Sequence, residues 1–141
     1  MKDKKSYYIL NLTWGLPMTL IGLIVATLLL ISGKRPHRHG GCFYFNVGKN
    51  WGGCNLGLIF LTDESDQEST KNHEFGHSLQ NTIFGPFMIV LVAIPSAIRY
   101  WHRELKFYRK GLKPTTAYDD IWFEGQATRL GNEYINKWRT L

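Results

Sequence analysis

His73-Glu74-Phe75-Gly76-His77 is the most informative stretch of this chain, because it sets two histidines four residues apart with a glutamate beside the first. On an α-helix, residues four apart lie on one face, so both imidazoles can reach a single metal ion. This is the pattern H-E-x-x-H, a zinc-binding arrangement in which the glutamate acts as a general base. The alternative is a helix with two solvated histidines. We expect His73 and His77 to be metal ligands and Glu74 to be catalytic.

The residues around the motif predict a helix over residues 66–84. Ser65 and Glu68 have the spacing of a capping box, in which a hydroxyl and a carboxylate satisfy the first free amides. Gly85-Pro86 is a stop signal, because glycine suits the C-terminal cap and proline cannot continue the helix. Most of this helix is polar, whereas an intramembrane protease would carry its ligands on an apolar spanning helix.

The N-terminal part of the chain predicts a membrane anchor over residues 1–33. No charged side chain occurs from Ser6 to Gly33, and this run exceeds the ~20 residues that cross a bilayer. It is therefore expected to be a transmembrane helix, either kinked at Pro17 or starting there. A cleaved signal peptide is the alternative, but its apolar core would be shorter and would end at a small-x-small site.

Composition and charge narrow the class of partner. The chain has 141 residues, of which 44% are hydrophobic and 14% aromatic, so one ordered domain is expected. Its net charge of +6 is compatible with nucleic acid. The basic residues, however, flank the apolar stretches at 2–5, 34–38 and 99–110. This placement favours anionic lipid headgroups, at ~1 kcal/mol per residue, so membrane lipids and no nucleic acid are expected. The positive-inside rule favours a cytoplasmic catalytic side only slightly.

The segment between the anchor and the motif is expected to contain a linker and a β-hairpin. Residues 34–41 are basic and rich in glycine and proline, which predicts a flexible linker with solvated histidines. Residues 42–47 and 55–62 have strand composition and flank a glycine-rich turn at 48–53. The second strand either binds an extended peptide at its edge or belongs to an ordinary core.

A second apolar stretch follows the motif helix at residues 85–98. Its apolar run is short for a membrane span. A full crossing would also place the bilayer between the motif and the best remaining carboxylate ligand, which follows this stretch in the chain. We therefore expect this stretch to dip into the membrane or to lie flat on it. Residues 99–110, rich in Tyr, Trp and basic side chains, then read as an interfacial belt, so that 85–110 is membrane-associated.

Zinc held by two histidines needs a further protein ligand and an open position for water. A last helix is predicted over 116–138, opened by a capping box at Thr116. The candidate ligands after the motif are Asp119, Asp120, Glu124 and Glu133. Glu124 is the best candidate, because small residues on its side of the helix permit close approach to the motif helix. The two aspartates suit the first turn, and Glu133 lies ~90° round the helix.

Two further features leave alternatives open. Cys42 and Cys54 are the only cysteines; they would pair outside the cytoplasm and stay reduced inside it. A second metal site formed with His37 and His39 fits no standard zinc spacing. The oxyanion donor of a hydrolase is not identified by the sequence, and its candidates are His102, Tyr118 and Tyr134.

Taken with these residues, the chain resembles a group of short, largely uncharacterised bacterial membrane proteins. They carry H-E-(F/Y)-G-H-S-x-Q, then G-P and I-P-S, then a glutamate within Y-T-E-x-x-A-D-x-L-G. The likeness covers roughly residues 55–131, through 73–80, 85–86, 94–96 and 123–131. The chain is similar more broadly to the gluzincin zinc peptidases, which have a glutamate third ligand. The resemblance implies Glu124 as that ligand and a bacterial cytoplasmic membrane as the location.

The chain departs from the group at Thr128, where the group has aspartate. A carboxylate there could orient a ligating histidine, whereas a hydroxyl hydrogen-bonds without adding charge.

Together these features predict an α+β fold with a zincin-like metal-binding domain over residues 42–141. One Zn²⁺ would be held by His73, His77 and Glu124, and Glu74 would activate water to hydrolyse a peptide or protein substrate. The expected function is a membrane-anchored zinc metallopeptidase. The alternatives are a non-hydrolytic zinc protein with a regulatory or scaffold role, and a basic interaction module in which the motif is accidental.

Overall fold

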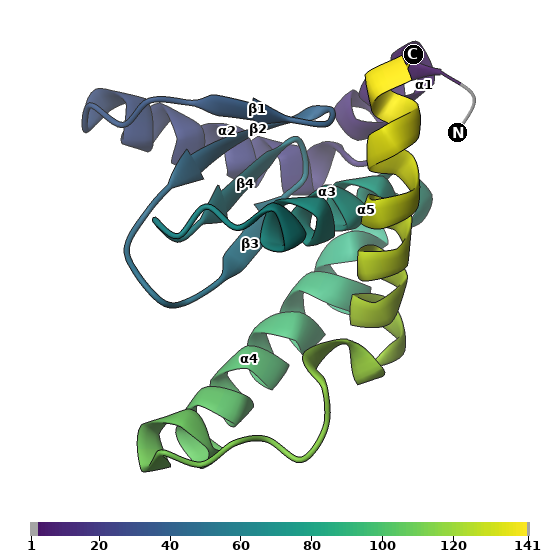
Figure 1. The fold of residues 1–141 in the computed structure, drawn as a ribbon. Helices are drawn as coiled ribbons and strands as arrows, with labels where there is room; N and C mark the ends of the chain where they lie inside the picture. Colours follow the sequence, from purple (N-terminus) through teal and green to yellow (C-terminus); the bar gives the residue numbers. More distant parts are fainter. Residues whose placement is uncertain (1–2, 141) are drawn as a thin grey trace.

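The computed structural model describes residues 3–140, which form five α-helices and a four-stranded mixed sheet (Figure 1). The predicted α+β class is confirmed. The outermost residues of the predicted regions 1–33 and 42–141 lie outside the described part of the chain.

The uncharged N-terminal stretch forms two helices, α1 (Lys4–Leu12) and α2 (Leu16–Ile31), at 86° to each other. The expectation that a helix starts at Pro17 is confirmed, because Pro17 lies in the first turn of α2. One continuous helix over the region is wrong, because α1 precedes the break. A Cβ at Gly15 would lie 2.3 Å from the amide of Asn81, so glycine is needed where the break touches the domain. Among residues 3–140, no one helix has both the length and the apolarity to cross a bilayer, while two bent helix pairs meet that criterion by length and composition alone.

Two short hairpins build the sheet, in the order β1-β2-β4-β3. β1 (His37–His39) pairs with β2 (Cys42–Asn46), and β3 (Gly53–Leu56) pairs with β4 (Ile59–Thr62), both antiparallel. β2 and β4 are parallel neighbours. The predicted pairing of 42–47 with 55–62 in one hairpin is therefore wrong. The reason is Gly57, whose φ of +75° turns the chain inside the second segment.

The stretch expected to be a flexible linker contains β1, and one of its histidines is buried. His39 is 9% exposed and its Nε2 lies 2.8 Å from Oδ1 of Asn72. Burial lowers the pKa of His39, which suits a neutral ring that donates this hydrogen bond. The prediction that both linker histidines are solvated is wrong for His39.

The motif helix is α3 (Glu68–Phe84), and it ends as predicted at Gly85, which has a φ of +56°. Its start differs from the prediction. Gln67 is the N-cap and makes no side-chain cap bond, while the Ser65 hydroxyl donates to Asp63 instead. The predicted capping box is therefore absent at this end of α3.

The second apolar stretch turns sharply away from α3, by 117°. It passes through η1 (Gly85–Phe87) and a π-helical turn, η2 (Ile89–Ala93), into α4 (Ile94–Lys106). In Figure 1, α4 leads away from the sheet, and the chain returns to the body through η3 (Tyr108–Lys110) and a loop.

The last helix follows a short turn, η4 (Tyr118–Asp120), and is α5 (Trp122–Thr140). Asp120 accepts a hydrogen bond from the backbone of Ala117, and this bond caps η4. The predicted start of the last helix at Thr116 is therefore wrong, because α5 begins at Trp122.

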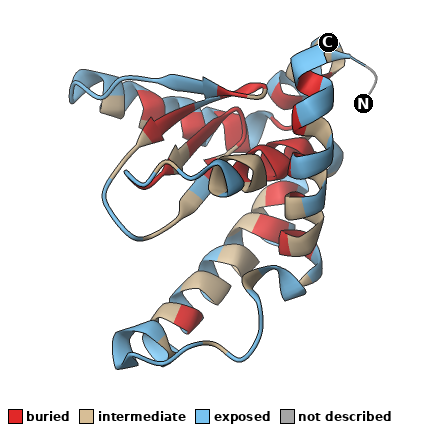
Figure 2. Cartoon of the chain, viewed as in Figure 1, coloured by how far each residue is buried: buried red, intermediate tan, exposed pale blue. Residues whose placement is uncertain are grey.

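The N-terminal helices belong to the core of the molecule. Tyr7 on α1 is fully buried with Phe60, Phe75 and Trp138, between the sheet, α3 and α5. Met18 and Ala26 on α2 join two further buried clusters. Burial is concentrated around the sheet and α3, while α4 is mostly exposed (Figure 2).

Candidate metal centre

Two glycines set the separation of α3 and α5. A Cβ at Gly76 would lie 1.9 Å from the backbone oxygen of Ala127, and one at Gly131 would lie 1.8 Å from that of Asn72. No other residue type permits this approach without moving a backbone. The small residues expected to bring the ligand helix close therefore act from both helices, and they place Glu124 beside the motif.

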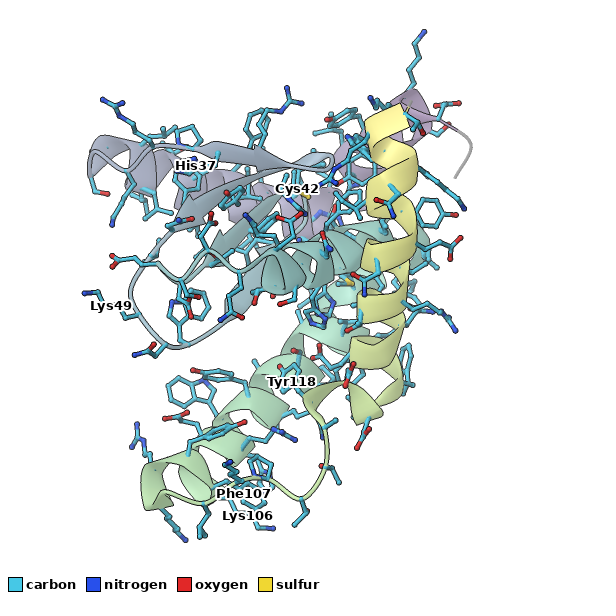
Figure 3. All side chains as sticks on the ribbon, in the orientation of Figure 1. His37, Cys42, Lys49, Lys106, Phe107 and Tyr118 are labelled. Atoms are coloured by element: carbon cyan, nitrogen blue, oxygen red, sulfur yellow. The ribbon has the colours of Figure 1, made fainter. Side chains whose placement is uncertain are left out.

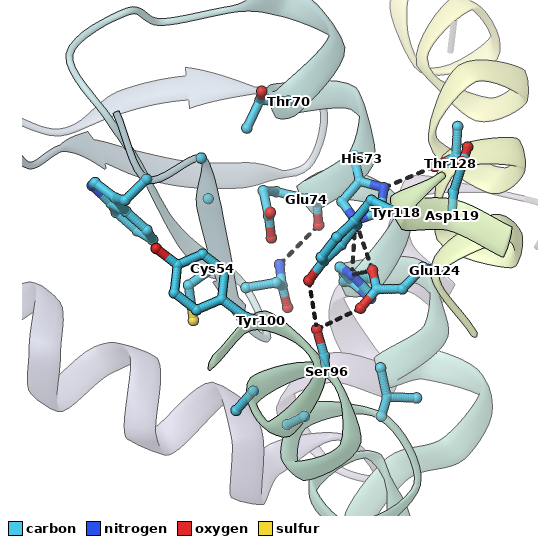
Figure 4. Close-up of a pocket in the computed structure, with 18 of the residues that line it drawn as sticks. Cys54, Thr70, His73, Glu74, Ser96, Tyr100, Tyr118, Asp119, Glu124 and Thr128 are labelled. Atoms are coloured by element: carbon cyan, nitrogen blue, oxygen red, sulfur yellow. Dashed lines mark hydrogen bonds and ion pairs between the residues drawn. The ribbon is translucent and has the colours of Figure 1, made fainter. Parts of the chain in front are cut away.

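Three side-chain atoms converge between the two helices (Figure 4). Oε2 of Glu124 lies 3.0 Å from Nε2 of His73 and 3.1 Å from Nε2 of His77, and the two Nε2 atoms are 3.1 Å apart. Glu124 is fully buried and His77 nearly so, while His73 is partly exposed. The three residues predicted as ligands are thus brought together.

The hydrogen bond made by Nδ1 of His77 determines the state of its Nε2, the nitrogen that faces Glu124. The amide nitrogen of Gln80 donates to the backbone oxygen of Phe123, at 2.7 Å, and to Oε1 of Gln126, at 2.9 Å. Its oxygen therefore faces Nδ1 of His77, at 2.7 Å, and accepts a hydrogen bond from the Nδ1–H group. In the neutral imidazole only one nitrogen carries a proton. With a metal ion bound and the ring neutral, Nε2 of His77 would thus present its lone pair to the ion.

His73 is oriented from α5. Its Nδ1 lies 2.9 Å from the hydroxyl of Thr128, and its Nε2 faces Glu124 (Figure 4). This is the position that the sequence marked as able to orient a ligating histidine. The contact is formed, but by a hydroxyl, so it adds no negative charge behind the ring.

The Glu124 carboxylate is held on its other side by Ser96, whose hydroxyl donates to Oε1. Burial by itself would raise the pKa of Glu124. Its contacts with the two imidazoles and with Ser96 outweigh burial and hold this pKa well below the usual range. The group is therefore an anion at the point where the two Nε2 atoms converge. When Nε2 of His77 carries no proton, a cation must take the proton's place between that nitrogen and the carboxylate.

The donor set fits a metal ion. Two ligands of a tetrahedral zinc ion at ~2.05 Å lie about 3.3 Å apart, and the three distances here are 3.0, 3.1 and 3.1 Å. The group of His73, His77 and Glu124 lies close enough to bind one metal ion. This part of the cofactor prediction is confirmed.

Glu74 lies beside this group and is not one of its donors. It is 4% exposed, and its Oε2 has no hydrogen-bond partner within residues 3–140. Burial raises the pKa of Glu74 to about 7. Strand β3 covers it so closely that a Cβ at Gly53 would lie 2.5 Å from Oε1. A buried, unpartnered carboxyl group is costly unless a ligand or water satisfies it.

A cleft of about 1010 Å³ opens beside these residues, between β3 and α4. Its wall includes His73, His77, Glu74 and Glu124 as well as apolar residues of α2, η2 and α4. Such a concave, largely apolar space with a few convergent polar groups is typical of a binding site.

The structure shows which of the remaining ligand and oxyanion candidates lie near the metal centre. Glu133 is exposed and pairs with Lys137, at 2.8 Å. Tyr118 lies next to His73, with ring centroids 6.3 Å apart, and its hydroxyl is 3.4 Å from that of Ser96. The other oxyanion candidates differ: His102 is exposed and does not line the cleft, and Tyr134 packs against the core.

The two cysteines are free thiols, Cys42 buried and Cys54 exposed on β3. Within residues 3–140 they form no metal-binding group with His37 and His39.

Two residues of the site, Gln80 and Ser96, were not predicted as site residues from the sequence. Both fall at fixed positions of the motifs H-S-x-Q and I-P-S, which was the available signal. Their roles depend on α4 and α5, which are distant in the chain. Comparison of the chain with protein-family models, with curated proteins and with solved structures gave no match.

Proposed function

We propose that this protein is a membrane-anchored zinc metallopeptidase. The observation that carries the proposal is the convergence of His73, His77 and Glu124 on one point, beside the unpartnered carboxyl group of Glu74 and an open cleft.

The donor set favours zinc. Two imidazole nitrogens and one carboxylate oxygen are typical of catalytic zinc, whereas structural zinc sites fill all four positions from protein. The cleft supplies the space for a fourth, exchangeable ligand. Held in this way, zinc acts as a Lewis acid and makes bound water acidic enough to serve as a nucleophile near neutral pH.

Glu74 and Tyr118 would supply proton transfer and hydrogen-bond donation. Glu74 accepts a proton at Oε2 and returns it to the leaving amine of the substrate. Its burial excludes competing solvent and brings its pKa to about 7, the range in which one group both accepts and donates. Tyr118 offers a hydroxyl at the edge of the site, and burial raises the pKa of Tyr118 to about 12, so that it stays a donor.

Membrane attachment is the second part of the proposal. The apolar outer faces of α2, η1 and η2 lie in the two bent helix pairs whose length and composition suit a membrane. The exposed side chains there include Leu20, Ile24, Leu28, Phe87 and Val90. Exposed apolar surface of this extent marks an interaction site, and lipid is the partner that the basic flanks favour.

One observation favours a second candidate, a zinc-binding membrane protein without hydrolysis. The hydroxyl of Thr128 occupies the place behind His73 where a carboxylate would strengthen the ligand. In this case zinc would organise α3 and α5 without turnover.

Metal analysis and one substitution test the proposal. Detergent-purified protein should hold about one zinc ion per chain, and His73→Ala, His77→Ala and Glu124→Ala should each lose most of it. Glu74→Gln should keep its zinc, while cleavage of a peptide found by mass spectrometry falls ~10²–10⁴-fold, since the base is removed. Glu133→Gln, on the exposed face of α5, is the matched control and should behave as wild type.

Other outcomes would change the assignment. Loss of zinc in Glu74→Gln would make that carboxylate structural. Zinc retained by Glu124→Ala would remove Glu124 from the site. Full zinc binding without any cleavage favours the non-hydrolytic candidate, and Thr128→Asp is then the variant to test for activity.

A further inference from the structure

A stripe of large apolar side chains runs along the outer face of α4. Ile94, Ile98, Trp101 and Leu105 are 48%, 65%, 54% and 53% exposed. Their spacing of four, three and four residues places them on one side of the helix. The opposite side faces the body, where Arg103 is buried and bonds the backbone oxygen of Thr116, at 3.0 Å. Within residues 3–140 the stripe is therefore an exposed apolar face that no other element covers.

Basic residues cluster beyond the stripe, at the C-terminal end of α4. Lys106 ends α4, and Arg109, Lys110 and Lys113 follow it; all four are exposed. Figure 3 shows Lys106 and Phe107 at the end of α4 remote from the sheet. An apolar helix face with a basic end and an indole at its edge is the composition of a helix lying in the interface of an anionic bilayer.

The cleft borders this face. Ala97, Tyr100 and Glu104 line the cleft, and at ~100° per residue they lie roughly 90° round α4 from the stripe. Trp101 belongs to both surfaces, since it is 54% exposed and also lines the cleft. If the stripe rests on lipid, one wall of the cleft stands at the level of the headgroups.

We propose that α4 rests on an anionic bilayer through this stripe, and that the cleft receives the membrane-proximal segment of a membrane-bound polypeptide. The inference rests on the proposed peptidase function and adds its substrate class. The apolar cleft residues Met18, Met88 and Val92 suit the side chains of such a segment. A soluble peptide would have to enter past the same lipid surface.

The position of α4 is tested first, with the whole chain in vesicles of phosphatidylcholine and phosphatidylglycerol. In a Cys54→Ser background, a fluorophore is attached through Ile98→Cys on the stripe, Tyr100→Cys in the cleft or Glu133→Cys on α5. Chain-brominated lipid should quench the label at 98, headgroup-nitroxide lipid the label at 100, and aqueous iodide the label at 133. A label at 98 that only iodide quenches would overturn the seating of α4, and the same result at 100 would overturn the position of the cleft.

The substrate class is tested by photocrosslinking in the same vesicles. Benzoylphenylalanine is placed at position 100, or at 133 as control, in zinc-loaded Glu74→Gln protein. The probe is a short fluorescent peptide of leucine, alanine and serine, with or without a palmitoyl chain. Position 100 should capture the tethered peptide ~10²-fold more than the free one, because the shared surface raises its effective concentration. Position 133 should capture neither.

Each remaining outcome counts against the inference. Equal capture of the tethered peptide at 100 and 133 would mean surface proximity only. Equal capture of both peptides at 100, or capture of neither, would exclude a membrane-bound substrate. The proposed function fails separately, if wild-type protein lacks zinc or cleaves neither peptide class, so the two failures are distinguishable.

Discussion

At the scale of single residues, the side chains behind the ligands decide what the ligands can do. The amide of Gln80 is fixed by Phe123 and Gln126, and this fixes the proton of His77 on the nitrogen away from the metal position. A histidine with the other tautomer would present a proton where a metal ion needs a lone pair. The orientation of one amide therefore sets the chemistry of the centre.

Substitution of Gln80 tests this. Gln80→Leu keeps the volume but leaves Nδ1 of His77 without an acceptor, so zinc affinity should fall ~10–100-fold in a competitive chelator titration. Gln67→Leu is the matched control, because Gln67 is exposed at the start of α3 and its side chain makes no capping hydrogen bond. Equal loss of affinity in both variants, or none in Gln80→Leu, would contradict the tautomer argument.

At the scale of elements, the centre depends on how closely α3 and α5 pack. Neither helix alone supplies the donor set, because two ligands lie on α3 and one on α5. The glycines at the contact have no role in either helix by itself. Glycine in a helix interior is destabilising by ~1 kcal/mol relative to alanine, so its presence at Gly76 indicates a requirement of packing.

Gly76→Ala tests the packing requirement, because helix propensity and packing predict opposite changes in the free energy of unfolding. By helix propensity alone the variant would be more stable by up to ~1 kcal/mol. The 1.9 Å approach to the Ala127 backbone instead predicts a net loss of about 1–3 kcal/mol in denaturant unfolding, together with weaker zinc binding as Glu124 is displaced. Asn136→Ala, exposed on α5, is the control and should change neither quantity. A more stable Gly76→Ala protein would show that the helices are free to separate.

At the scale of the whole molecule, the N-terminal segment is both an apolar surface and part of the core. Its outer residues face away from the domain, while Tyr7 lies among residues of the sheet, α3 and α5. The Tyr7 hydroxyl also contacts Cys42, at 3.2 Å, and Ser78 on the motif helix. The segment is therefore not a separable anchor in this fold.

Tyr7→Ala should accordingly destabilise the metal-binding domain. The loss of a fully buried aromatic side chain costs about 3–5 kcal/mol, which should appear as a lower Tm in detergent and as lower zinc occupancy. Ile9→Ala, two residues away and 60% exposed, is the control and should leave both unchanged. If Tyr7→Ala protein melts like wild type, the N-terminal helices are only an attachment to the membrane.

The sequence alone determined the features that depend on neighbours in the chain. His73 and His77 share a face because of the helical repeat, and α3 ends at Gly85 because of that glycine and the proline after it. The proposed third ligand, Glu124, was predicted by a weaker route: the chemistry of zinc requires a further ligand, and small residues on one side of the last helix permit its approach.

Only the tertiary structure decided how distant segments meet. The parallel pairing of β2 with β4, the right-angle break between α1 and α2, and the burial of His39 all depend on contacts made after the elements form. The roles of Gln80 and Ser96 likewise appear only when α3, α4 and α5 pack together. A side chain's hydrogen-bond partner is set by the three-dimensional packing, and sequence spacing determines it only within one helix or turn.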